Sequence, residues 1–132
     1  WLGKVDDDFL VGAYHAATAL LFPSNARSEG FGLVQVESMA SECPVINTEI
    51  LNSGVSWVSP NEETGLTVPV NDSRALAAAA RRLLDEPELR KRLATAAHHR
   101  ARNVFDAPEM ARRSIDIYRR VLIVAAKSRP AA

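Results

Sequence analysis

Short apolar runs alternate with helical segments through the first half of the chain, and this alternation restricts the fold more than any other feature. The runs ALLFP (residues 19–23) and PVINT (44–48) are too short for helices and have the composition of strands that are buried on both faces. Apolar residues at three- and four-residue spacing predict helices over residues 5–17 and 33–41. Strands that are joined through helices lie parallel, so we expect an α/β domain with a parallel sheet and flanking helices.

The second half of the chain is predicted to be mainly helical. Two short segments before it, residues 54–59 and 65–70, are expected to be extended because glycine and proline punctuate them. One helix should start after the cap residue Asp72, and another near Pro87, whose missing N–H costs nothing in a first turn. A last helix is predicted over residues 107–126.

The totals describe a single globular domain. The chain has 132 residues, no net formal charge and one cysteine, so we expect one domain over residues 1–132 with a disordered tail at 127–132. The basic residues alternate with Ala and Leu at helical spacing and form no patch, which argues against nucleic acid as a partner. A lone cysteine favours a reducing compartment such as the cytoplasm.

The first residues predict a chain that is a piece of a longer protein. Trp1–Gly3 looks like the end of a strand whose start is missing, and there is no initiator methionine. A truncated domain would leave a sheet edge and part of its last helix uncovered. We therefore expect the isolated chain to self-associate.

The stretch SEGFGLVQVESMA (residues 28–40) places two carboxylates around a glycine-rich turn that leads into a helix. Gly30 and Gly32 allow a sharp turn and a close approach of a ligand to the main chain. A helix start offers unpaired N–H groups, which suit a phosphate. Glu37 would accept two hydrogen bonds from a vicinal diol such as a ribose, and Glu29 would bind hydroxyls at the other end of the same ligand.

Spacing alone leaves a plain structural alternative open. A Gly-x-Gly before a helix is common, and two glutamates at this separation often lie on a solvated face. The position of the turn favours a ligand, because parallel sheets bind ligands beyond the carboxyl ends of their strands. The loops at residues 24–32 and 49–55 are both expected there.

The chain resembles the C-terminal half of retaining glycosyltransferases of the GT-B architecture, family GT4, in two stretches, LLFPSNARSEGFGLVQVESMASECPVINTE (20–49) and ETGLTVPVNDSRALAAAARRLLDEPELRKRL (63–93). Members share a strand ending in Pro-Ser, a Glu, Gly-Phe-Gly, a second Glu, a Pro-Val strand and a Thr-Gly-Leu-x-Val turn. All of these elements occur here in that order. The resemblance implies a Rossmann-like domain that binds a nucleotide-diphosphate sugar.

The resemblance also implies roles for individual residues. Glu29 would be the catalytic carboxylate, which binds hydroxyls of the donor sugar, and Glu37 would hold the ribose. The main chain between them would bind the donor through Gly30, Phe31, Gly32, Leu33 and Val34. The implied reaction transfers a sugar to an acceptor hydroxyl with retention of configuration, and no metal or other cofactor is expected.

Further partners follow from the same resemblance. A missing N-terminal domain would bind the acceptor, so the isolated chain would be inactive. The whole enzyme would build cell-surface polysaccharide or glycoconjugate in the cytoplasm, with peripheral contact to the inner face of the membrane. Two alternatives stay open: a non-catalytic module that binds a nucleotide sugar, and an epimerase of GT-B-like architecture.

The sequence departs from many relatives at residues 41–45, SECPV, where they have a glycine before the Pro-Val strand.

Two other residues invite functional interpretations. Cys43 is expected to be a buried structural cysteine, because a nucleophile would need a partnered histidine. Trp57 could stack on a base, but a place in the core is the stronger expectation.

Overall fold

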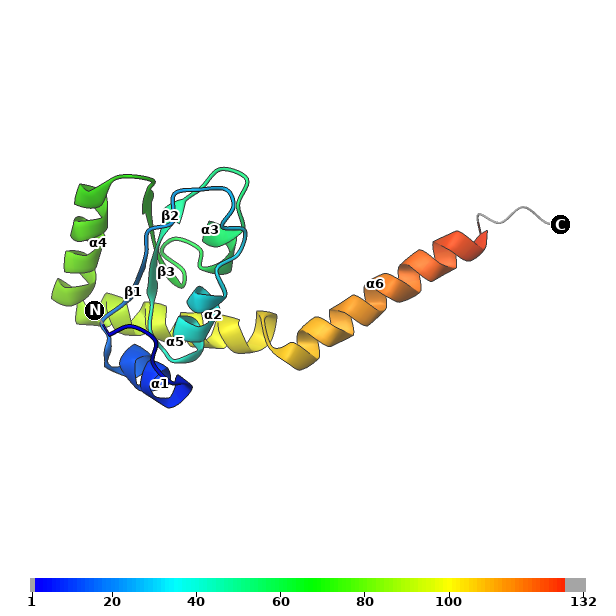
Figure 1. Cartoon of the computed structure of the whole chain (residues 1–132), viewed down its shortest axis with the longest axis horizontal. Coiled ribbons are helices and arrows are strands. Elements are labelled where there is room, and N and C mark those ends of the chain that lie inside the picture. The colour runs from blue at the N-terminus through cyan, green and yellow to red at the C-terminus, as the bar shows by residue number, and fades with distance from the viewer. Residues whose placement is uncertain (1, 128–132) are drawn as a thin grey trace.

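A computed structural model of the chain describes residues 2–127 (Figure 1). Three strands form one sheet in the order β1 (Leu20–Phe22), β2 (Val45–Glu49) and β3 (Gly65–Pro69), and both neighbouring pairs are parallel. The predicted α/β fold with a parallel sheet is confirmed.

Helices surround this sheet at positions that largely match the sequence prediction. Asp6 caps the first helix by accepting from the Phe9 N–H at 2.8 Å, and Asp72 caps the fourth by accepting from the Ala75 N–H at 2.8 Å. The helices of the described chain are α1 (Asp7–Ala16), α2 (Leu33–Ala40), α3 (Val55–Val58), α4 (Ser73–Asp85), α5 (Pro87–Val104) and α6 (Ala107–Lys127).

The sequence prediction needs correction in three places. Residues 55–58 form the short helix α3 and not an extended segment, because Val55 and Val58 both reach the core at helical spacing. Leu2 and Gly3 are not part of a strand, and Trp1 lies outside the described residues. Lys127 still belongs to α6, and the rest of the predicted disordered tail, residues 128–132, also lies outside the described residues.

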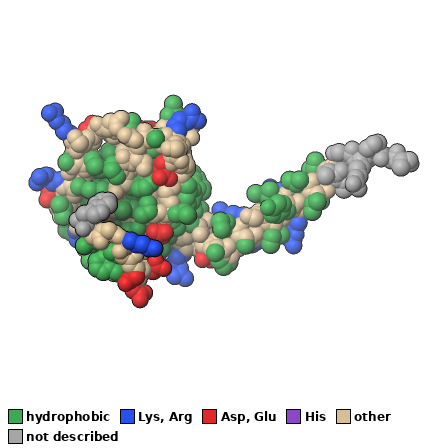
Figure 2. Space-filling model, in the orientation of Figure 1, with side chains coloured by type: hydrophobic (Ala, Val, Ile, Leu, Met, Phe, Trp, Pro, Cys, Tyr) green, Lys and Arg blue, Asp and Glu red, His purple; other side chains and the backbone are tan. Residues whose placement is uncertain are grey.

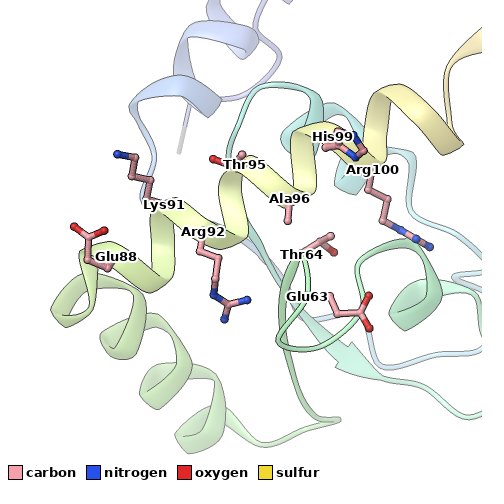
Figure 3. Close-up of a pocket in the computed structure, with 9 residues that line it drawn as sticks. All are labelled: Glu63, Thr64, Glu88, Lys91, Arg92, Thr95, Ala96, His99 and Arg100. Carbon is pink, nitrogen blue, oxygen red and sulfur yellow. The ribbon is translucent and has the colours of Figure 1, made fainter.

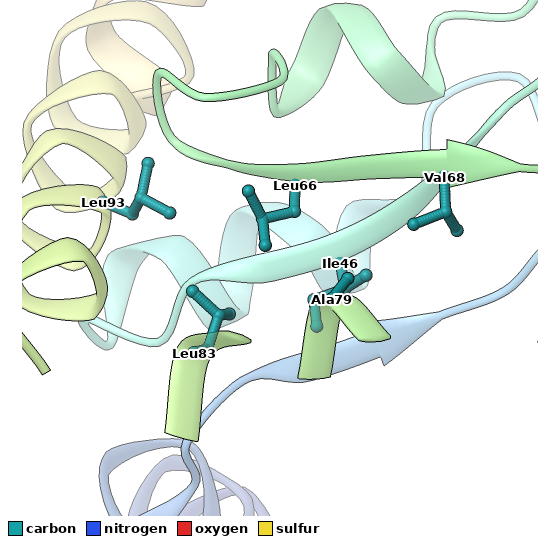
Figure 4. Packing of buried hydrophobic residues seen from close by; sticks show 6 residues of the cluster. All are labelled: Ile46, Leu66, Val68, Ala79, Leu83 and Leu93. Carbon is teal, nitrogen blue, oxygen red and sulfur yellow. The ribbon is translucent and has the colours of Figure 1, made fainter. Parts of the chain in front are cut away.

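The core has two clusters, one on each face of β2. Ile46 faces α4 and packs in a cluster with Leu66, Val68, Ala79, Leu83 and Leu93 (Figure 4). Val45 points to the opposite face, because successive side chains of a strand alternate, and it packs with residues of α2, α3 and α5. The sheet therefore lies between α4 on one side and α2 with α3 on the other (Figure 1), while α5 contributes to both clusters.

This arrangement places two loops at one edge of the sheet. The carboxyl end of β1 leads into residues 23–32, and the carboxyl end of β2 leads into residues 50–54. Because β1 and β2 are parallel neighbours, both loops leave the sheet at the same edge. The sequence prediction for these two loops is therefore confirmed.

Helix α6 extends from the body of the molecule as an arm (Figure 1). Hydrophobic side chains line much of this arm in Figure 2, and the exposed large ones include Met110, Ile117, Tyr118, Val121 and Leu122. Within residues 2–127, no helix combines the length and the apolarity that are needed to cross a bilayer.

We expect the isolated chain to self-associate through α6. Ile117 and Val121 are one helical turn apart and share a side of the helix, and covering them removes apolar area from water. Light scattering at high concentration should therefore give a mass above the 14.4 kDa of one chain. The double variant I117S/V121S should lower that mass, whereas R119S, on another side of α6, should not. A monomer mass for the unmodified chain would contradict this expectation.

Candidate functional site

The turn between β1 and α2 depends on glycine at one position and leaves space at another. Gly32 is the N-cap of α2 with a φ of 76°, and a Cβ there would lie 2.7 Å from the ring of Phe22. Both the left-handed backbone and this contact require glycine. A Cβ at Gly30 would meet no atom within 4 Å, so the surface beside Gly30 is open to a ligand.

The loop after β2 is bonded to this turn. The Ser53 hydroxyl donates to the Glu29 carbonyl at 2.6 Å, and the Gly54 N–H donates to the Gly30 carbonyl at 2.9 Å. The approach is so close that a Cβ at Gly54 would lie 2.5 Å from the Gly30 oxygen. The two loops at this edge of the sheet are therefore one hydrogen-bonded unit.

A buried polar network lies directly beneath the turn. Gln35 of α2 and Asn47 of β2 are both fully buried. The Gln35 Nε2 donates to the Phe31 carbonyl at 2.8 Å, and the Asn47 Nδ2 donates to the Gln35 Oε1 at 3.0 Å. The Thr67 hydroxyl donates to the Asn47 Oδ1 at 2.8 Å. In the part of the chain that the structure describes, no buried side-chain nitrogen or oxygen lacks a partner, so the network is complete.

The Phe31 ring holds the turn through contacts with two other aromatic rings. It meets Phe105 edge to face, with ring centroids 5.5 Å apart, and Trp57 at 6.3 Å. Trp57 is 55% exposed, so its predicted place in the core is wrong. It lies at the outer edge of this aromatic cluster, where the Arg100 guanidinium lies 5.4 Å from its ring centroid.

Glu37 borders a hollow between α1 and α2. The hollow measures about 350 Å³ and is lined by Asp7, Leu10, Val11, Tyr14, Glu37, Ala40 and Ser41. The Tyr14 hydroxyl lies 3.4 Å from the Glu37 Oε2 and donates to it. Burial, followed by the negative charge of Glu37, raises the pKa of Tyr14, so the phenol stays protonated and remains a donor.

The remaining predicted site residues lie together on the turn. Glu29 is half-buried at its start and is not among the residues that line the hollow beside Glu37. Within the described chain, no acceptor is bonded to the backbone N–H groups of Phe31, Gly32, Leu33 or Val34. The turn and the first residues of α2 therefore offer several free donors in a row.

A larger hollow, of about 680 Å³, lies along α5 near the amino end of β3 (Figure 3). Both arginines that line it already have structural partners. Arg100 donates to the carbonyls of Val58 and Trp57 at 3.0 and 2.7 Å, and Arg92 donates to that of Glu62 at 3.0 Å. We therefore place the candidate site at the turn before α2 and not in this hollow.

Two other features were considered as sources of reactivity, the cysteine Cys43 and a metal-binding cluster. Cys43 is buried, as expected, and burial raises the pKa of its thiol, which makes it a poor nucleophile. Among the described residues, no group of three or more His, Cys, Asp and Glu side chains is arranged to hold a metal ion.

Comparison with known proteins decides the family. A family profile described as glycosyl transferases group 1 matches residues 1–100. The chain belongs to this family. Its α/β fold is that of the C-terminal domain of GT-B glycosyltransferases, as superposition on solved structures shows.

Individual relatives of this group 1 glycosyl transferase chain support the assignment. It is 37% identical over 107 residues to the D-rhamnosyltransferase WbpZ of Pseudomonas aeruginosa. The aligned segment covers 81% of this chain and 28% of the relative. The chain is 28% identical over 120 residues to the O-antigen chain mannosyltransferase C of Escherichia coli, covering 91% and 32%. The sucrose-phosphate synthase structure from Thermosynechococcus elongatus superposes with a TM-score of 0.81 at 33% identity, covering 93% and 30%. The chain thus spans about a third or less of these proteins.

Sequence reasoning missed the residues that support the turn. Gln35 and Asn47 each interrupt an apolar run with a polar side chain, which was the available signal for a buried hydrogen-bond network. Ser53 and Gly54 fall within a loop that was assigned to the site edge, but their bonds to the turn depend on contacts 24 residues apart in sequence. Nothing in the sequence pairs Tyr14 with Glu37.

Replacing Gly54 by alanine should separate the two loops. The new Cβ would overlap the Gly30 carbonyl oxygen, so we expect the free energy of unfolding to fall by about 1–3 kcal/mol in urea denaturation. Gly30→Ala is the matched control, because its Cβ would enter open space, and it should change that free energy by no more than about 0.5 kcal/mol. Equal effects of the two substitutions would disprove the close contact.

Proposed function

We propose that this domain binds the nucleotide-sugar donor of a retaining glycosyltransferase at the turn from Glu29 to Val34. The observation that carries the proposal is the row of free N–H donors on this turn, which has Glu29 at its start and is followed by Glu37 one helical turn into α2. Backbone N–H groups at a helix start bind phosphate oxygens well, because the donors point outward and the helix dipole favours negative charge. Membership of the group 1 family supports sugar transfer as the reaction.

The two glutamates take different parts in this proposal. Glu37 accepts hydrogen bonds from the ribose hydroxyls, and the bond from Tyr14 to its Oε2 holds the carboxylate in place for them. Glu29 is the catalytic residue, which binds hydroxyls of the donor sugar. The diphosphate lies between them on the amides of Gly30, Phe31, Gly32, Leu33 and Val34, of which Phe31 and the three residues after it have no other acceptor.

The chemistry follows from this placement. The bond between the sugar carbon and the leaving phosphate oxygen breaks, and the acceptor oxygen forms a bond on the same face of the sugar. The acceptor proton passes to the leaving phosphate, so the configuration is retained without a covalent intermediate. The domain contributes mainly by stabilising charge on the leaving diphosphate with fixed N–H dipoles and by holding the donor in place. The proposal assigns no metal or other cofactor.

The partners proposed for the whole protein follow from its relatives. The chain spans 28% of the length of WbpZ, and we propose that a further N-terminal domain supplies the acceptor site. The names of WbpZ and the E. coli O-antigen mannosyltransferase favour rhamnose, mannose or a similar sugar, added to a cell-surface polysaccharide or glycoconjugate. Assignment to family GT4, and a cytoplasmic location at the inner face of the membrane, stay predictions.

Substitution of each glutamate should give a different defect in the full-length protein. Glu37→Ala should weaken calorimetric binding of UDP or GDP, whichever binds the unmodified protein, by about 1.5–3 kcal/mol, the value of hydrogen bonds to a charged group. Glu29→Ala should leave that affinity unchanged, because neither ligand carries the donor sugar, and should lower the rate of sugar transfer.

The outcomes separate the proposal from its rivals. Unchanged nucleoside diphosphate affinity in Glu37→Ala would remove Glu37 from the ribose site, and an unchanged transfer rate in Glu29→Ala would remove Glu29 from catalysis. Donor binding without any transfer by the full-length protein would favour a non-catalytic module. Conversion of the bound sugar without transfer would favour an epimerase. Glu63→Ala, at the hollow along α5, is the control that should change neither quantity.

A further inference from the structure

We infer that Gln35 is a positioning residue for the donor diphosphate, which acts by fixing the direction of the N–H groups on the turn. Gln35 is fully buried and is bonded to the turn twice: its side-chain amide donates to the Phe31 carbonyl, and its backbone N–H donates to the Gly32 carbonyl at 2.9 Å. It therefore has no direct contact with the space where the donor would lie. The inference rests on the function proposed above and identifies what holds that site in its binding geometry.

Three consecutive carbonyl groups of the turn are held by donors from elsewhere in the chain. The Glu29 carbonyl accepts from the Ser53 hydroxyl, the Gly30 carbonyl from the Gly54 N–H, and the Phe31 carbonyl from the Gln35 Nε2. In a planar trans peptide, the C=O and the N–H of the next residue point in opposite directions. Fixing these three carbonyls toward the supporting loop and α2 therefore turns the next three N–H groups the other way.

The direction of the Gln35 amide is itself fixed. If its oxygen and nitrogen were exchanged, an acceptor would face the Phe31 carbonyl, and a donor would face the Asn47 Nδ2. Asn47 cannot exchange to relieve this, because its Nδ2 also donates to the carbonyls of Val55 and Ser59, at 3.2 and 3.0 Å, and a carbonyl can only accept. Hydrogen-bond donation therefore runs in one direction from β3 through β2 and α2 to the turn.

The polarity of this network is better explained by the turn than by stability. Gln35 and Asn47 are fully buried. Burying their two amide groups lowers the stability of the fold unless each polar atom has a hydrogen-bond partner, and complete pairing only offsets the loss of hydration. An apolar side chain of similar size would fill the space without that requirement. It would leave the Phe31 carbonyl without its donor, so the peptide between Phe31 and Gly32 would be free to rotate.

The test compares two ligands that differ only in the diphosphate. In the full-length protein, UDP and uridine, or GDP and guanosine, are titrated by calorimetry against the unmodified protein and Gln35→Met. The variant keeps the size of the side chain and removes its donors. We expect the diphosphate affinity to fall about tenfold or more, the value of one hydrogen bond to a charged group, while the nucleoside affinity changes less than about twofold. A general loss of structure would lower both.

Thr64→Val is the matched control. It removes a buried hydrogen bond between two hydroxyl groups, the 3.1 Å pair of Thr64 with Ser59. Ser59 contacts the network only through its main-chain carbonyl, which accepts from the Asn47 Nδ2 at 3.0 Å and is kept in this variant. Thr64→Val should lower the free energy of unfolding and leave the ratio of diphosphate to nucleoside affinity unchanged. Ser53→Ala removes the donor to the Glu29 carbonyl and carries the same test if Gln35→Met does not fold.

Different results would overturn the positioning role of Gln35 and the proposed function. An unchanged ratio of diphosphate to nucleoside affinity in Gln35→Met, or in Ser53→Ala where that variant replaces it, would overturn the positioning role and leave the proposed function standing. If the unmodified protein binds no nucleoside diphosphate, the proposed function falls, and this inference falls with it. A selective loss of diphosphate affinity in the turn variants, with Thr64→Val unchanged, would support both.

Discussion

The central constraint in this domain is that the carbonyl groups of the turn before α2 are bonded inward. Ser53, Gly54 and Gln35 supply those bonds from the neighbouring loop and from α2 itself. Peptide planarity then directs the N–H groups of the turn outward. In the proposed function, the diphosphate would need no charged side chain at this point, because the backbone supplies the donors and the start of α2 adds its dipole.

The sheet makes this constraint possible. Both loops of the site leave the carboxyl edge of parallel neighbours, and β2, buried on both faces, fixes their separation. Asn47 lies on this central strand, so the hydrogen-bond network beneath the turn is attached to the buried centre of the domain. Preorganised dipoles of this kind cost nothing at the moment of reaction, since folding has already oriented them. The free energy that orients these groups is therefore supplied by folding of the core.

The sequence predicted the layers and the edge of the sheet but not the supports of the site. Periodicity located β1, β2 and α2 within about a residue, because each has one dominant hydrophobic pattern. It failed at α3, where four residues are too few to show a period, and at Trp57, whose neighbours come from distant segments. The resemblance indicated which turn residues to examine. It could not indicate Gln35, Asn47 or Tyr14, whose roles depend on contacts between segments that are far apart in the chain.

The most direct measurement is a crystal structure of the full-length protein with a bound nucleoside diphosphate. The account predicts phosphate oxygens within about 3 Å of the backbone nitrogens between Gly30 and Val34, with the ribose hydroxyls on Glu37. The carbonyls of Glu29, Gly30 and Phe31 should keep their inward bonds. A diphosphate bound in the hollow along α5, or a turn whose carbonyls face the phosphate, would contradict the account.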